Sequence, residues 1–197
     1  MAEAYRELLN TFGRGWERGA VDEIASVFAS DAVFLETPFS ARSAGIDAIS
    51  GVPNACEPIP GIVTGGQPAP EHLAALKRAG CAVVIDLREA MEPRPFKTPD
   101  ALVQAGLEYL SIPVGHGAVS DATFSGVVDA VRELAGKRPA FVHCSSGNRV
   151  GAALLPYFML EQGLEEEDAV AEAMRVGLRS AELMERALEY VRSRQGI

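Results

Sequence analysis

Downstream of residue 60, short apolar runs alternate with stretches of helical periodicity. The apolar runs predict strands at 62–64, 81–87, 107–114 and 140–143, and the continuous run at 81–87 predicts a strand buried on both faces of a sheet. The periodic stretches predict helices, at 70–78, 100–105, 121–134, 150–162, 165–176 and 180–193. Strands that alternate with helices in this way predict an α/β fold, with a mostly parallel central sheet flanked by helices.

The first fifty residues follow a different pattern. Apolar side chains at helical spacing predict two amphipathic helices there, followed by a strand. Three prolines within 51–60 then predict an irregular connector. We therefore expect two domains, a small α+β appendage at 1–50 and the main domain at 51–197. The appendage is predicted to dock a partner or a second copy of the chain, which would make a homodimer.

Composition narrows the classes of function. The chain has 197 residues, 48% of them hydrophobic, and a net charge of −9, which argues against nucleic acid or an anionic membrane as partner. Three cysteines at unrelated spacings predict no disulfide framework. His72, His116 and His143 are isolated in the sequence, so we expect neither a metal nor another cofactor. No apolar run has transmembrane length and no signal peptide is recognisable, so a cytoplasmic location is expected.

The candidate chemistry lies between the last predicted strand and the helix that follows it. A loop runs from Cys144 to Arg149, with a thiol at one end and a guanidinium at the other. A short strand-to-helix loop points backbone N–H groups inward at the positive end of the helix dipole, which makes it a cradle for an anion. The same surroundings favour the thiolate form of a thiol. The loop thus predicts a sulfur nucleophile beside a bound anion.

These residues carry a resemblance to a known family. His143 and Cys144, followed by Gly147 and Arg149, resemble the signature of cysteine-dependent phosphatases. Three further motifs, IVTGGQP at 62–68, VIDLR at 84–88 and YLSIP at 109–113, are similar to the beta-lactamase-hydrolase-like, dual-specificity-phosphatase-like branch. The resemblance covers about residues 52–192 and implies a protein tyrosine phosphatase-like fold. Residues 1–50 resemble the opening of the nuclear-transport-factor-like (SnoaL-like) fold.

The resemblance implies a role for each residue of the site. Cys144 would attack phosphorus and form a phosphocysteine, while Arg149 would hold two oxygens of the phosphate. The general acid that protonates the leaving oxygen would be His116 or Asp121. The rest of the substrate-binding loop would comprise His143, Ser145, Ser146, Gly147, Asn148 and Val150. Many phosphatases carry Ser or Thr at the last of these positions, so the valine predicts slow turnover.

One departure from the phosphatase pattern leaves the function open. Protein tyrosine phosphatases place five residues between cysteine and arginine, whereas only four separate Cys144 from Arg149. Rhodanese sulfurtransferases typically have the shorter loop, in which Cys144 would carry a persulfide. A non-catalytic anion-binding module is the third alternative. The expected partner is a small anion in each case, either a phosphate ester or a sulfane sulfur donor for the enzymes.

Overall fold

The computed structural model describes residues 47–117 and 119–196, and the elements predicted within 1–46 lie outside them. The described residues form a five-stranded sheet in the order β1-β2-β5-β3-β4. Its strands are β1 (Cys56–Ile59), β2 (Ile62–Gly65), β3 (Val83–Asp86), β4 (Glu108–Ser111) and β5 (Ala140–His143). All neighbouring strands are parallel except β1, which pairs antiparallel with β2 at one edge. The predicted α/β fold with a mostly parallel sheet is confirmed.

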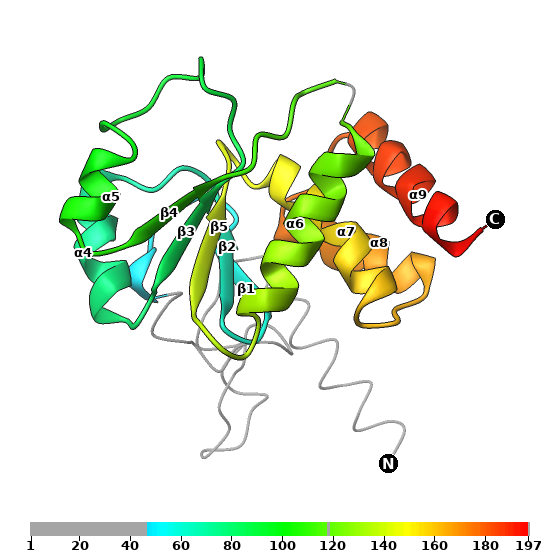
Figure 1. Ribbon diagram of the computed structural model, residues 1–197, viewed down its shortest axis with the longest axis horizontal. Coiled ribbons are helices and arrows are strands. Elements are labelled where there is room, and N and C mark those ends of the chain that lie inside the picture. The colour runs from blue at the N-terminus through cyan, green and yellow to red at the C-terminus, as the bar shows by residue number, and fades with distance from the viewer. Residues whose placement is uncertain (1–46, 118, 197) are drawn as a thin grey trace, which may run out of the picture. The chain divides into compact units, whose positions relative to one another are not determined.

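Helices cover both faces of this sheet (Figure 1). One face carries α4 (Pro70–Arg78) and α5 (Asp100–Gln104). The other face carries α6 (Asp121–Leu134), α7 (Asn148–Leu160), α8 (Glu166–Val176) and α9 (Ala181–Gln195). None of the helices in the described ranges has the length and the apolar character that a membrane crossing needs.

A hydrophobic core lies on each face of the sheet, between the strands and the helices that cover that face. Val84 and Phe141 pack in the cluster that includes Leu73 of α4 and Leu102 of α5. Ile85, Val142 and their neighbours belong to the larger cluster under α6 to α9. Successive residues of a strand point to opposite faces, so a strand between two helical layers is apolar over most of its length, and Asp86 and His143 are polar only at the carboxyl ends of β3 and β5. This burial on both faces explains the apolar runs in the sequence.

Two elements differ from the sequence prediction. The connector at 51–60 contains a strand, β1, and Pro58 lies within it. A proline is tolerated there because β1 is an edge strand, where a missing N–H breaks no ladder on the open side. Helix α7 begins at Asn148, two residues before the predicted start, so Arg149 belongs to the first turn of the helix.

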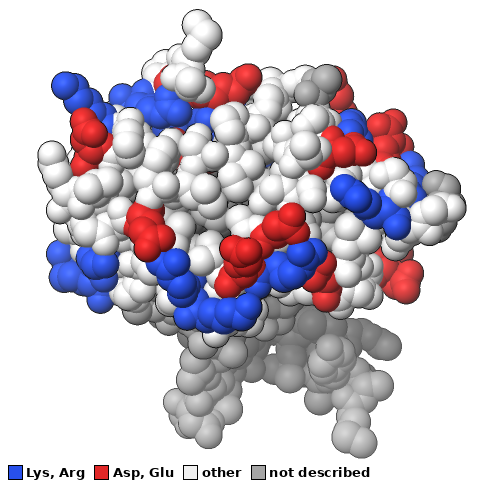
Figure 2. Space-filling view, in the orientation of Figure 1, with Lys and Arg blue, Asp and Glu red and all other residues white. Residues whose placement is uncertain are grey.

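The surface carries charges of both signs. On the face drawn in Figure 2, acidic and basic side chains are interspersed. Two of the exposed pairs are Arg132 with Glu161 and Arg138 with Glu108. Exposed pairs of this kind contribute at most about 1 kcal/mol each to stability, because water screens them. The stability of the domain therefore rests on its two cores.

Candidate functional site

The loop from Cys144 to Arg149 lies at the carboxyl edge of the sheet. It connects β5, which lies between β2 and β3, with α7 (Figure 1). In open α/β sheets ligands bind outside the carboxyl ends of the strands. The Cys144 side chain is 1% exposed, and its backbone N–H donates to the carbonyl of Gly65 on β2. The predicted nucleophile is thus at the end of a central strand, where the fold offers a binding edge.

Gly147 turns the chain into the helix beside the sulfur. It precedes α7 with a φ of 96°, a conformation that favours glycine. A Cβ on this residue would lie 2.9 Å from the carbonyl oxygen of Val176, so a side chain has no room there. The Gly147 N–H donates to Cys144 Sγ over 3.1 Å. The sulfur therefore lies at the N-terminal end of α7, where the helix dipole favours negative charge.

Neighbouring segments hold the loop from outside. The carbonyl of Ser145 accepts from the N–H of Gln67, and that of Ser146 accepts from Asn54 Nδ2 at 2.6 Å. In a trans peptide the N–H points away from the carbonyl, so the N–H groups of Ser146 and Gly147 are directed to the inner side. Asn148 Oδ1 accepts from the backbone N–H groups of Arg179 and Ser180, in the segment that connects α8 with α9. The loop is thereby a cradle whose donors face inward.

The guanidinium of Arg149 is buried and holds an oxyanion supplied by the protein itself. Its two terminal nitrogens donate to the two carboxylate oxygens of Glu92, over 2.5 and 2.6 Å. They also donate to the carbonyl of Val114 and to Ser145 Oγ. Burial alone would lower the pKa of Arg149, but Glu92 and the Cys144 sulfur raise it. The same contact with Arg149 lowers the pKa of Glu92 to about 2, against a smaller opposing effect of burial.

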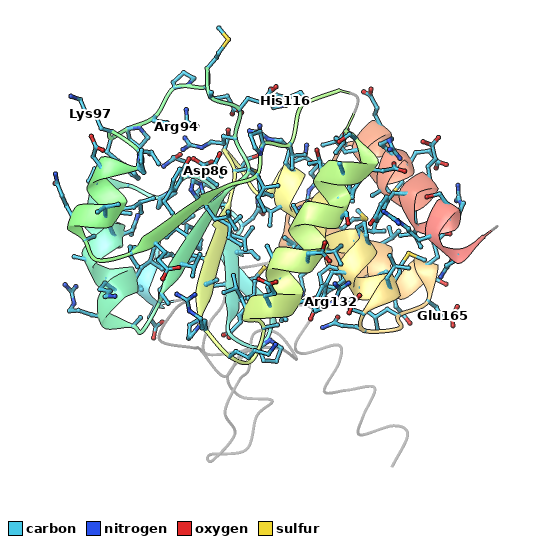
Figure 3. All side chains as sticks on the ribbon, viewed as in Figure 1. Asp86, Arg94, Lys97, His116, Arg132 and Glu165 are labelled. Carbon is cyan, nitrogen blue, oxygen red and sulfur yellow. The ribbon has the colours of Figure 1, made fainter. Side chains whose placement is uncertain are left out.

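Sequence reasoning missed Glu92, which lies in the loop between β3 and α5. That loop is built on a buried carboxylate, Asp86, whose oxygens accept from Arg88 over 2.9 and 2.7 Å. Arg94 lies above Asp86 in Figure 3, with its Nε 3.6 Å from Asp86 Oδ2. The remaining nitrogens of Arg94 donate to the carbonyls of Glu89, Ala90 and Glu92. Asp86 and Arg94 thus fix the backbone that carries Glu92.

His143 links this network to the nucleophile. The ring is buried, with Nδ1 3.3 Å from the carbonyl of Cys144 and Nε2 3.9 Å from Asp86 Oδ1. Burial lowers the pKa of His143 to about 4, and the nearby Asp86 opposes this only partly. The neutral imidazole is therefore the form present near neutral pH. A buried ring in hydrogen-bond contact with the Cys144 carbonyl can orient the loop.

The lowered pKa of His143 predicts an acid-dependent loss of stability. Between pH 6.5 and 4, His143 binds a proton in the unfolded chain but stays neutral in the folded chain. The free energy of unfolding therefore falls as the pH is lowered through this range. The full effect is about 3 kcal/mol, reached near pH 4. In the His143→Gln variant this part of the pH dependence should be missing. Urea unfolding at a series of pH values measures it, and equal slopes in both proteins would contradict the prediction.

The two candidate acids lie in different surroundings. His116 is exposed on the loop that follows β4 (Figure 3), and a ring nitrogen lies within 4.8 Å of one carboxylate oxygen of Glu89 and one of Glu92. Because Glu92 contacts Arg149, His116 is brought to the mouth of the site. Asp121 instead begins α6 and forms an ion pair with Arg186 of α9. Val150 is fully buried in the core under α6 to α9.

The three side chains at the mouth also have the composition of a cation site. Glu89, Glu92 and His116 each offer one ligand atom, all within 4.8 Å of one another. The carboxylate of Glu92 is, however, already neutralised by Arg149 and accepts from Ser145 Oγ. This competition weakens the set as a metal centre.

Comparison with known proteins identifies the family to which this chain belongs. Residues 58–190 match the family model described as "DSP-PTPase phosphatase fused to NAD+ kinase". No curated protein matches the chain by sequence. The family match covers the strands β2 to β5 and the loop from Cys144 to Arg149, so it includes every predicted site residue.

Solved structures share the fold. A DUF442 phosphatase candidate from Shewanella putrefaciens CN-32 is 21% identical, with a TM-score of 0.64 over 76% of this chain and 97% of its own. Tk-PTP in its active form is 24% identical, with a TM-score of 0.63 over 72% of this chain and 98% of its own. A Cys-to-Ser variant of TpbA from P. aeruginosa in complex with pTyr is 23% identical, with a TM-score of 0.54 over 69% and 80%.

Proposed function

Because the chain belongs to the dual-specificity-like family of cysteine phosphatases, we propose that it hydrolyses phosphomonoesters with Cys144 as nucleophile. One observation supports Cys144 as the nucleophile. The Cys144 sulfur accepts the Gly147 N–H at the start of α7, next to a guanidinium that already binds an oxyanion, the Glu92 carboxylate. Hydrolysis of a phosphate ester through a phosphocysteine needs a sulfur nucleophile, inward N–H groups and a planar fork, and the loop from Cys144 to Arg149 brings these three components together.

In the first step the Cys144 thiolate attacks phosphorus and the bond from phosphorus to the ester oxygen breaks. Negative charge is spread over the three equatorial oxygens of the transferring group. The N–H groups of the loop and the Arg149 guanidinium stabilise this charge, because they are held in place beside a buried sulfur. The product is a phosphocysteine, together with the leaving group that carries the former ester oxygen.

His116 is the proposed general acid. It gives its proton to the leaving oxygen, which then departs as a neutral alcohol or phenol. Its position near Glu89 and Glu92 at the mouth of the site supports this role, whereas the pairing of Asp121 with Arg186 accounts for Asp121 without catalysis. In the second step water attacks the phosphocysteine and returns a proton to His116. The bond from phosphorus to sulfur breaks, which releases phosphate and restores the thiolate.

The substrate class is a small or terminal phosphomonoester that can reach a sulfur at the bottom of a loop. The TpbA variant, which shares the fold, binds pTyr, and this supports an aryl phosphate as a first substrate. Membership of the phosphatase family favours this chemistry over sulfur transfer and over passive anion binding. The test is phosphate release from an aryl phosphate, with thiocyanate formation from thiosulfate and cyanide measured on the same preparation. Thiocyanate without phosphate would overturn the proposal.

Replacing His116 with alanine is expected to make the rate depend on the leaving group. Hydrolysis of phenyl phosphate should fall about 10²-fold, since a poor leaving group needs protonation, and that of 4-nitrophenyl phosphate much less. The measurement is kcat for a series of substituted phenyl phosphates. The same series on Asp121→Asn discriminates the two candidates, because steeper dependence in that variant alone would assign the acid to Asp121 instead.

A further inference from the structure

We propose that Glu92 is an internal ligand of the oxyanion site, which a substrate phosphate has to displace from the fork of Arg149. The inference rests on the proposed phosphatase function and names the residue that sets oxyanion affinity in that site. The contact that suggests it is the two-point ion pair between the Glu92 carboxylate and the terminal nitrogens of Arg149.

The hydrogen-bond donors of Arg149 show why both ligands cannot use the fork together. The two terminal nitrogens carry four hydrogens, and four acceptors use them: both oxygens of Glu92, the carbonyl of Val114 and Ser145 Oγ. Only the Nε–H remains, and a guanidinium has five N–H donors in all. Two-point binding of a phosphate therefore requires at least one present acceptor to leave. The carbonyl of Val114 is fixed in the backbone, which leaves side chains to move.

Glu92 is the ligand placed to leave. Its side chain is 17% exposed, whereas that of Arg149 is 2% exposed, so the carboxylate lies on the solvent side of the guanidinium. The backbone at Glu92 is held separately, through its carbonyl by Arg94 and through that of Pro93 by Arg88. The carboxylate can thus swing away without unfolding the loop. The carboxylate would then lose the hydrogen bonds that it accepts from Ser145 Oγ and from the Glu89 N–H. Both donors are exposed, so water can replace the carboxylate at each of them.

Charge decides which anions can replace it. A carboxylate brings one negative charge, so an incoming monoanion gains little over Glu92 in the fork. A phosphate dianion brings a second charge and further oxygens, which can accept from the inward N–H groups of the loop. Glu92 therefore makes the site selective for dianions, and it keeps the buried Arg149 charge paired when no substrate is bound.

The experiment measures binding of inorganic phosphate by calorimetry, without turnover, to the intact chain. Glu92→Gln should bind phosphate about 10-fold more tightly, because a competing charged hydrogen-bond partner is removed. Glu89→Gln is the matched control, since it removes one charge from the same mouth of the site without touching the Arg149 fork, and its gain in phosphate affinity should be clearly smaller than that of Glu92→Gln. Monoanionic formate should show the larger gain in Glu92→Gln.

Weaker or unchanged phosphate binding in Glu92→Gln would overturn the proposal, because it would make Glu92 a permanent support of the guanidinium. An equal gain in Glu89→Gln would overturn it too, since general charge would then be the cause. If Glu92→Gln does not fold, Glu92→Asp tests the same point. Its shorter side chain reaches the fork poorly, so affinity should rise, and a fall contradicts the proposal. Loss of ester hydrolysis with these results intact would count against the proposed function alone.

Discussion

Replacing Cys144 with serine is expected to reduce hydrolysis of an aryl phosphate at least about 10⁴-fold, as removal of a catalytic nucleophile typically does. A serine hydroxyl at this position fits the cradle but remains protonated, and the Gly147 N–H and the Arg149 guanidinium cannot compensate for that. Binding of inorganic phosphate should persist, because its ligands are N–H groups and Arg149. The measurements are kcat for hydrolysis and the dissociation constant of phosphate on the same variant.

Cys81→Ser is the matched control for that variant. Cys81 is also buried, but its sulfur donates to the carbonyl of Val83 in the core next to α4 and α5, and a serine can make the same bond. Acid quenching of the unmodified protein during turnover should trap one added phosphoryl group on the peptide containing Cys144. Unchanged hydrolysis in Cys144→Ser, or a phosphoryl group on another residue, would refute the assignment of the nucleophile.

Replacing Arg149 with lysine should reduce kcat about 10³-fold, even though the positive charge is kept. Lysine has one ammonium group and cannot bind two equatorial oxygens at once, so much of the charge stabilisation in the transition state is lost. Glu92 also loses its two-point partner, which should lower the free energy of unfolding. The measurements are kcat at saturating substrate and urea unfolding of the same preparation.

A surface arginine provides the comparison for Arg149→Lys. Arg132 pairs with Asp129 and Glu161 outside the site, and it lies on α6 far along the helix from the loop that carries His116 (Figure 3). Arg132→Lys should leave kcat unchanged. Retention of most activity in Arg149→Lys would mean that charge alone, without the fork, supports the reaction, and the proposed role of the guanidinium would then be wrong.

Most of the fold could be predicted from the sequence because burial on two faces leaves a strong pattern. Val84 faces the core under α4 and α5, while Ile85 faces the core under α6 to α9, so neither position can be polar. Strand β1 could not be found in this way. Pro58 marks it as a connector, and only pairing with β2 at the sheet edge makes it a strand.

The sequence predicts the loop of the candidate site but does not point to the counter-ion of Arg149. Cys144, Gly147 and Arg149 are close in sequence, so their spacing carries the signal. Glu92 is 57 residues away from Arg149, in a loop that also contains Glu89 and that leads to Asp100, the first residue of α5. Only the anchoring of that loop on Asp86 selects among the three. The signal is physical: a buried arginine requires an anion, and this loop begins at the same edge of the sheet, directly after β3.

The segment before β1 sets a minimum length for any shortened form of the protein. The family match begins at residue 58, yet Asn54 fastens the Ser146 carbonyl and Pro53 accepts from Gly66. Ile49 and Val52 are buried in the same core as Phe141, which precedes the loop on β5. A chain trimmed to the matched region would keep every proposed catalytic group but lose the side chain that restrains the back of the cradle. The folded unit that carries the site therefore extends further toward the N-terminus than the residues that match the family model.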